Sequence, residues 1–253
     1  MKPLFRPASL KALHNHLAKP CLLVFDFDGV LTPILAARTR SFPSPGTRAL
    51  LRTLGECAPV AVVSGRGLRD VAGRLGFKPL YILGNHGFEG PQEFRKGQAA
   101  AEKANRAWVK AFPAIRARLP HSGLDLENKK LSLSIHYHLS PEPGRTRKAL
   151  LAWADSLVPK PRVVAGKNVI NLVHPQAAHK GDGMRWLLAK TKLPRAIYIG
   201  DDVTDEDVFR LRDKRVLTVY VGRKRGFSAQ YSIPSQKHID RFLKLLLKER
   251  PLP

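Results

Sequence analysis

The chain has 253 residues, of which 43% are hydrophobic and 25% are charged. These proportions describe an ordinary water-soluble globular protein with enough apolar residues for one large domain or two modest ones. The charge is unusual, because 44 Lys and Arg against 20 Asp and Glu give a formal net charge of +24. Such an excess suits a nucleic-acid-binding protein or an enzyme that draws in phosphorylated substrates. Because the basic residues are scattered and their runs are short, the sequence favours a generally basic surface and no specific nucleic-acid partner.

Cysteine usage and hydropathy limit the location of the protein. Cys21 and Cys57 do not make a disulfide framework, so a reducing compartment is favoured. No apolar segment approaches the roughly 18 residues that a membrane span requires, and the first apolar run contains carboxylates, unlike a signal-peptide core. We therefore expect a cytoplasmic protein with no membrane association. A monomer is expected as well.

The first part of the chain alternates between strand and helix patterns. After an amphipathic segment at 9–17, the apolar run that ends at Phe25 predicts a strand buried on both faces of a parallel sheet. The next expected elements are a helix that begins at Pro45, a strand at 59–63, a helix at 68–75 and a strand at 80–83. This alternation predicts right-handed crossovers and a parallel sheet.

The pattern changes near residue 88 and resumes near residue 173. The intervening segment predicts a small antiparallel α+β unit, with a helix at 97–119 in which Pro113 marks a kink or break, an alternating strand at 131–137 with one buried face, a helix at 145–157, and strands at 162–165 and 169–173. Beyond it we expect a helix at 180–188, strands at 196–199 and 216–221, and a closing helix near 239–247. The predicted organisation is a core of residues 1–87 and 173–253 with a cap of residues 88–172. When the five predicted core strands are numbered along the chain, from the one that ends at Phe25, their expected order in the sheet is 3-2-1-4-5.

Polar groups follow several strands of the predicted core, where ligands of an open α/β sheet bind. They are Asp26, Asp28, Ser64, Asp201, Asp202 and Asp205, with Lys180 at the start of a helix. Carboxylates at one sheet edge suit a hard cation, and Mg²⁺ fits best. A carboxylate beside that ion can attack phosphorus while Lys180 and the Ser64 hydroxyl hold the phosphoryl oxygens. A second carboxyl group can protonate the leaving group and later activate water.

Four segments in order resemble the motifs of the haloacid dehalogenase superfamily: Asp26 to Thr32, Ser64-Gly65-Arg66, Lys180-Gly181 and Gly200 to Glu206. More narrowly, residues 20 to about 245 resemble trehalose-6-phosphate phosphatases, through 26–34, 63–66, Asn85-His86-Gly87, Glu127-x-Lys129 and His136-Tyr137. The resemblance implies an α/β fold, with a Rossmann-like parallel-sheet core and an inserted α+β cap that closes over the sugar. It also implies Mg²⁺-dependent hydrolysis of trehalose 6-phosphate, a phosphorylated disaccharide, through an aspartyl-phosphate intermediate.

The resemblance implies a role for each matching residue. Catalysis would fall to Asp26 as nucleophile and Asp28 as general acid and base, and phosphate binding to Ser64, Gly65 and Lys180. Mg²⁺ would be held by Asp26, the Asp28 backbone carbonyl and Asp201, with Asp202 and Asp205 near it. The sugar would be contacted by Arg66, Asn85, His86, Glu127 and Lys129.

Each assignment has a structural alternative. Ser64 could cap the next helix, Lys180 could be a solvated surface lysine, and the acidic run at 201–206 could be a helix N-terminus favoured by its dipole. Glu127 and Lys129 could be an exposed strand pair. His136 and His138 fall on the polar face of an alternating strand, where solvated histidines are favoured.

The chain departs from the family pattern in the predicted cap. Leu172-Val173-His174-Pro175 stands where the family has Glu-x-Arg/Lys-Pro, so the expected glutamate is Leu172 unless Asn171 substitutes for it. His138 stands where an arginine is usual. These departures leave open a phosphatase for another phosphorylated sugar. A catalytically inactive, basic nucleic-acid-binding protein of the same fold is the other alternative.

Overall fold

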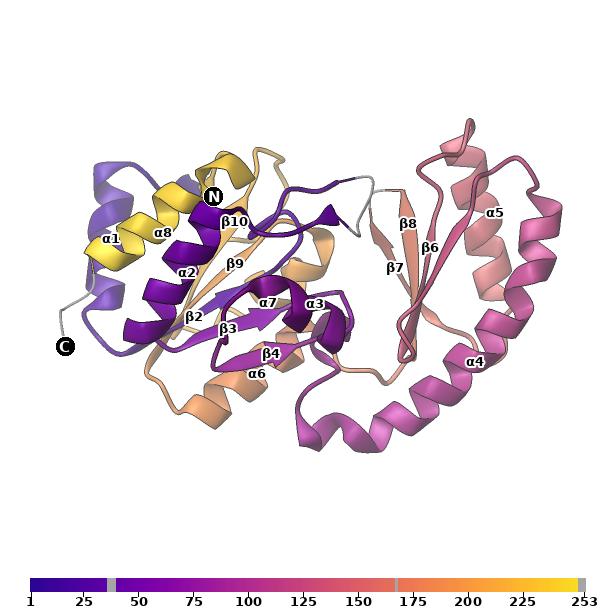
Figure 1. Ribbon diagram of the computed structural model, residues 1–253, viewed down its shortest axis with the longest axis horizontal. Coiled ribbons are helices and arrows are strands. Elements are labelled where there is room, and N and C mark those ends of the chain that lie inside the picture. Colours follow the sequence, from indigo (N-terminus) through magenta and orange to yellow (C-terminus); the bar gives the residue numbers. More distant parts are fainter. Residues whose placement is uncertain (36–39, 167, 250–253) are drawn as a thin grey trace. The chain divides into compact units, whose positions relative to one another are not determined.

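The structure is a computed structural model that describes residues 1–35, 40–166 and 168–249 (Figure 1). The chain divides into two compact units. Unit 1 comprises Met1–Gly90 with His179–Pro253, and unit 2 comprises Pro91–Ala178. Each unit has its own sheet and its own apolar core.

In unit 1, the described strands form a parallel seven-stranded sheet in the order β1-β11-β10-β9-β2-β3-β4. The strands are β1 (Lys2–Pro3), β2 (Cys21–Phe25), β3 (Val60–Val63), β4 (Tyr81–Leu83), β9 (Arg195–Gly200), β10 (Val216–Val221) and β11 (Tyr231–Ile233). The predicted order of five strands is confirmed as β4-β3-β2-β9-β10. The sequence analysis missed β1 and β11, because two or three residues are too short to show a periodic pattern.

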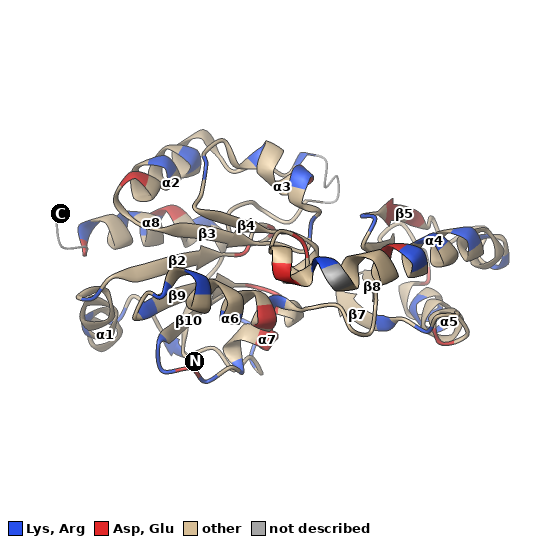
Figure 2. Cartoon of the chain, turned by 90° about the horizontal axis from the view of Figure 1, so that it is seen from below, with Lys and Arg blue, Asp and Glu red and all other residues tan. Residues whose placement is uncertain are grey.

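Helices cover both faces of this sheet. They are α1 (Pro7–Leu17), α2 (Pro45–Cys57), α3 (Leu68–Leu75), α6 (Lys180–Thr191), α7 (Glu206–Phe209) and α8 (Ile239–Lys248), with 3₁₀ turns at Asn85–Gly87, Val203–Asp205 and Gln236–His238. Figure 2 shows α2, α3 and α8 on one face and α6 and α7 on the other. The strand residues alternate accordingly: Leu23 and Phe25 join the first apolar cluster, and Leu22 and Val24 join the second.

Strand β2 positions the candidate site. Its side chains from Leu22 to Phe25 are fully buried, which confirms a strand covered on both faces. Burial of each such side chain contributes about 1.5–3 kcal/mol, so the strand is firmly placed. The β2–β9 ladder continues past the strand end, because the Asp26 N–H donates to the Ile199 carbonyl over 2.9 Å. Asp26 therefore lies beside the end of β9.

Unit 2 contains an antiparallel four-stranded sheet of described residues in the order β5-β6-β8-β7. Its strands are β5 (Asp125–Asn128), β6 (Ser132–His136), β7 (Arg162–Gly166) and β8 (Val169–Val173), and its helices are α4 (Arg95–Arg118), α5 (Pro143–Asp155) and a 3₁₀ turn at Gln92–Phe94. Apolar side chains of α4 and α5 pack on one face of the sheet. The predicted antiparallel α+β character of this segment is confirmed.

Two expectations about unit 2 were wrong in part. Helix α4 continues through Pro113 and bends along its length instead of ending (Figure 1). Trp108, Phe112 and Ile115 are buried in the unit 2 core on both sides of the proline, and this packing offsets a penalty of about 3 kcal/mol. All five residues of β6 are buried, and on its polar face Ser134 Oγ donates to Asn171 Oδ1 over 2.5 Å.

The length and hydropathy of a helix show whether it could span a membrane. Within residues 1–35, 40–166 and 168–249, none of the helices combines the length and the apolar character that crossing a bilayer demands.

Candidate active site

Glycines allow carboxylates to gather at the ends of β2 and β9. Gly29 has a φ of +79°, and a Cβ there would lie 2.0 Å from Asp201 Oδ2. A Cβ on Gly200 would lie 2.3 Å from Asp205 Cγ. Any side chain at either position would displace an acidic group, so both glycines are needed for the close approach.

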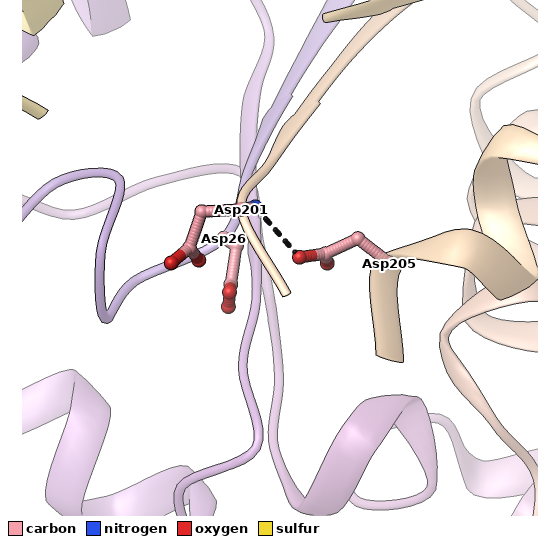
Figure 3. Close-up of side chains that lie close together, drawn as sticks. All are labelled: Asp26, Asp201 and Asp205. Carbon is pink, nitrogen blue, oxygen red and sulfur yellow. Dashed lines mark hydrogen bonds between the residues drawn. The ribbon is translucent and has the colours of Figure 1, made fainter. Parts of the chain in front are cut away.

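The carboxylates of Asp26, Asp201 and Asp205 each offer an oxygen within 4.8 Å of the others. In Figure 3, Asp26 and Asp201 lie side by side, and the Asp205 carboxylate approaches from the 3₁₀ turn that follows β9. The backbone N–H groups of Asp201 and Asp202 donate to Asp205 Oδ2 over 2.8 and 2.9 Å. The turn that carries the acidic run is thus folded around the Asp205 side chain.

Lys180 lies among these carboxylates at the first position of α6. Its side chain is buried, and its Nζ lies 3.0 Å from Asp26 Oδ2 and donates to Asp205 Oδ1 over 2.7 Å. The Tyr198 hydroxyl donates to the same Asp205 oxygen over 2.6 Å. The alternative that Lys180 is a solvated surface lysine is therefore wrong.

The start of α6 is fixed by a residue that the sequence analysis missed. His179 Nδ1 accepts from the backbone N–H groups of Gly181 and Asp182, and the Asp182 side chain accepts from the His179 N–H. The acidic residue three positions after His179 was the available signal, but histidine is not among the favoured capping residues. This cap holds the helix end that presents Lys180.

The electrostatics of the cluster favour an additional cation. Burial, together with the charge of Asp205, raises the pKa of Asp26 to about 8. The nearby positive charge of Lys180 lowers this pKa but offsets the increase only in part. Burial and the charges of Asp26 and Asp205 likewise raise the pKa of Asp201 well above its ordinary value. Asp201 Oδ1 is buried and has no hydrogen-bond partner among the described residues. Carboxylate oxygens with this excess of negative charge fit Mg²⁺.

Lys180→Met is expected to lower the free energy of unfolding of the metal-free protein by about 3–5 kcal/mol, because it leaves buried carboxylates without their ammonium partner. Urea denaturation at neutral pH measures this change. Lys190→Met, on the exposed side of the same helix, is the matched control and should change stability by less than about 0.5 kcal/mol. An equally small effect of Lys180→Met would contradict the buried ion pairs.

A second group forms around Asp28 and Ser64. Arg66 Nε and Nη2 donate to the two carboxylate oxygens of Asp28, each over 2.7 Å. Ser64 is fully buried, and its Oγ accepts from the Arg66 N–H over 3.1 Å. The helix that follows, α3, has Gly67 at its N-cap, so the alternative that Ser64 caps it is wrong.

Asn85 and His86 lie in a tight turn after β4, with φ values of 47° and 61°. A Cβ on Gly65 would lie 2.6 Å from the His86 ring, so the glycine allows the ring to lie against the backbone. Asn85 Nδ2 donates to Glu89 Oε2 over 2.7 Å, and the same oxygen accepts from the Leu68 N–H over 2.8 Å. The sequence analysis missed Glu89, since no local pattern distinguishes it from a surface glutamate.

Comparison with known proteins identifies the family. The sequence model of the trehalose-phosphatase family matches residues 24–241. The chain belongs to this family. A trehalose-phosphate phosphatase from Mycobacterium tuberculosis (strain ATCC 25618 / H37Rv) is 30% identical over 97% of this chain, and one from Mycobacterium ulcerans (strain Agy99) is 34% identical over 73%. The chain spans 68% of the first relative and 50% of the second.

A solved structure supports the same fold for this member of the trehalose-phosphatase family. The C-terminal domain of trehalose-6-phosphate phosphatase from C. albicans is similar with a TM-score of 0.75 at 20% identity, over 98% of each chain. The predicted family and the predicted α/β fold are confirmed.

The remaining predicted site residues of the trehalose-phosphatase chain lie in unit 2. Lys129 Nζ and His136 Nε2 lie 3.6 and 3.5 Å from Glu127 Oε2. The Lys129 side chain is 8% exposed, so the alternative of an exposed strand pair is wrong for this residue. His136 is also buried, contrary to the expectation of a solvated histidine, because it lies beside Glu127 instead of facing water. His138 is exposed, as expected.

Strand β8 places the two residues that could stand for the family glutamate, Leu172 and Asn171, on opposite faces of the sheet. Leu172 is fully buried in the apolar core of unit 2. Asn171 pairs in register with Ser134 of β6, which pairs in register with Glu127 of β5. Because cross-strand partners share a face of the sheet, Asn171 and not Leu172 lies on the same face as Glu127. We call Glu127, Ser134 and Asn171 the polar row.

Proposed function

We propose that the chain is a Mg²⁺-dependent sugar-phosphate phosphatase whose best substrate is trehalose 6-phosphate. The observation that carries the proposal is the cluster of the buried Lys180 and Asp26 with the half-buried Asp201 at the ends of β2 and β9, in a chain of the trehalose-phosphatase family. A monomeric, cytoplasmic enzyme is part of the proposal.

Asp26 attacks the phosphorus, and the bond to the sugar oxygen breaks. Asp28 donates a proton to that oxygen, and the sugar leaves with the phosphoryl group on Asp26. Asp28 then takes a proton from water, whose oxygen attacks the same phosphorus. The bond to Asp26 breaks, and phosphate leaves with the carboxylate restored. Lys180, with the Ser64 hydroxyl and the backbone at Gly65, binds the phosphoryl oxygens throughout.

Asp26 and Asp201 are the side chains that would hold the ion, together with the Asp28 backbone carbonyl. Each oxygen of Asp205 already accepts two hydrogen bonds, which uses both of its lone pairs, so the part of Asp205 is to orient Lys180 and the Asp201–Asp202 backbone. When bound, Mg²⁺ supplies positive charge against the phosphoryl oxygens and favours the carboxylate form of Asp26.

In this proposal Glu127, Lys129, Asn85 and His86 keep the sugar-recognition role that the family resemblance implies. The polar row presents an amide where the family has a carboxylate. Loss of one charge-assisted hydrogen bond to a sugar hydroxyl costs about 1.5–3 kcal/mol, or roughly ten- to a hundredfold in discrimination. Asn171 can still form a neutral hydrogen bond, so we expect specificity to be relaxed but not lost.

A substrate panel tests this function. Equal amounts of enzyme with Mg²⁺ are assayed for phosphate release from trehalose 6-phosphate, sucrose 6-phosphate and glucose 6-phosphate. We expect the highest kcat/KM with trehalose 6-phosphate. A higher kcat/KM for either competitor would refute trehalose 6-phosphate as the best substrate, but the assignment as a phosphatase would stand. If no ester released phosphate in the presence of metal, the nucleic-acid-binding alternative would be favoured. Figure 2 shows Lys and Arg spread along many helices and not on a single element, which does not suggest a dedicated nucleic-acid surface.

A further inference from the structure

A chain of alternating charges runs through unit 1 from Asp28. Arg66, which holds both Asp28 oxygens, also donates from Nη1 to Asp70 Oδ2 over 2.9 Å. Arg74 Nε donates to the other Asp70 oxygen over 2.7 Å, and Arg74 Nη1 donates to the Ser41 carbonyl over 3.3 Å. We call Arg66, Asp70 and Arg74 the arginine–aspartate chain. It connects Asp28 to the backbone of Ser41, a buried residue.

The spacing of these residues explains how the chain is built. Arg66 precedes α3, Asp70 lies in its first turn and Arg74 in its last, and residues four apart on a helix are neighbours. Hydrogen bonds from both arginines hold the pKa of Asp70 below its ordinary value, although burial alone would raise it. Asp70 therefore remains a charged acceptor that fixes the arginines on either side.

Arg66 is more deeply buried than the residue it contacts. Its side chain is 5% exposed and its guanidinium lies 5.4 Å from the Phe27 ring centroid, whereas the Asp28 side chain is 38% exposed. A bidentate arginine fork fixes the plane of a carboxylate as well as its position. A buried Arg66, hydrogen-bonded to Asp70 as well, therefore sets the orientation of the more exposed Asp28.

We infer that Asp70 and Arg74 are positioning residues that act through Arg66 to orient the Asp28 carboxylate for proton transfer. This inference rests on the proposed function, in which Asp28 is the general acid and base. It gives Arg66 a part in the chemical step, in place of the sugar contact that the family resemblance implies. A displacement of about 1 Å at a reacting group can cost on the order of a hundredfold in rate, so the orientation matters.

Steady-state kinetics with trehalose 6-phosphate and Mg²⁺ separate positioning from binding. Asp70→Ala should lower kcat about tenfold and leave KM within about twofold, because Arg66 loses the partner that fixes it and Asp28 is then less well oriented for proton transfer in the transition state. Arg66→Lys keeps the charge but loses the fork, so its kcat should fall on the order of a hundredfold. An increase in KM at unchanged kcat in either variant would show a binding role and overturn the inference.

A double-mutant cycle tests whether Asp70 acts through Asp28. In the Asp28→Asn background, Asp70→Ala should have no further effect on kcat. If the two residues acted independently, the fold-reductions in kcat of the two single variants would multiply in the double variant. Multiplied effects would overturn the inference. Asp70→Asn keeps the side-chain shape and replaces the alanine variant if that variant does not fold. Asp213→Ala removes a surface partner of Arg215 in the same unit and should leave kcat unchanged. A wild-type enzyme that hydrolyses no sugar phosphate would refute the proposed function itself.

Discussion

Asp26→Asn is expected to reduce turnover of trehalose 6-phosphate by on the order of 10⁴-fold or more, the scale seen when a nucleophile is removed. An amide is a poor nucleophile and a weak ligand for Mg²⁺, so two roles fail together. The measurement is phosphate release at saturating substrate, with mass spectrometry to exclude deamidation. Asp213→Asn, a surface carboxylate of the same unit, is the control and should retain full activity.

Stability separates a chemical defect in this variant from a folding defect. The pKa of Asp26 is raised from its ordinary value of 3.8 to about 8, so the folded, metal-free wild type binds a proton more tightly than the unfolded chain. Its free energy of unfolding should therefore fall, relative to Asp26→Asn, as the pH rises from about 4 to about 8. The variant should accordingly be folded at neutral pH. Retention of more than a few per cent of activity would refute the assignment of Asp26 as nucleophile.

Removal of divalent metal is expected to abolish activity, and Mg²⁺ should restore it. Because Asp26 and Asp201 take up protons more readily than ordinary carboxyl groups, Mg²⁺ must displace protons when it binds. Its affinity should therefore weaken as the pH falls below about 8. Titration calorimetry in buffers of different ionisation enthalpy measures the released protons.

Ca²⁺ is the matched comparison for Mg²⁺. It prefers more ligands and longer bonds, so it should occupy the site while misplacing Asp26 relative to the phosphorus. We expect Ca²⁺ to inhibit the Mg²⁺-loaded enzyme in assays at a constant total concentration of divalent metal. Full activity in excess chelator would show that hydrolysis does not need the cation that the acidic cluster fits.

Much of the fold was predictable because its elements carry long, periodic patterns. The buried run of β2 and the helix over 68–75 were located from apolar spacing, and the parallel order followed from their alternation. The short strands β1 and β11 lack such a pattern, and their places depend on pairing with distant strands. Of the kink or break predicted at Pro113, the break does not occur, because packing around α4 outweighs the local preference of proline.

The site was predictable where residue type alone carries the chemistry. Asp26, Asp201 and Lys180 were chosen from their positions beside predicted strand and helix ends, and the structure brings them together. The pairing of Asp28 with Arg66, and of Arg66 with Asp70, was not foreseen, because it depends on side-chain directions that no spacing in the sequence gives. The choice between Leu172 and Asn171 likewise required the register of β8.

Trapping of the phosphorylated enzyme tests the central claim most directly. The Mg²⁺-loaded protein is mixed with trehalose 6-phosphate, quenched in acid within one turnover, digested and analysed by mass spectrometry. We predict one phosphoryl group on Asp26, and none at this position in Asp26→Asn. Phosphate release by the wild type with the phosphoryl group on another residue, such as His86, would contradict the proposed mechanism.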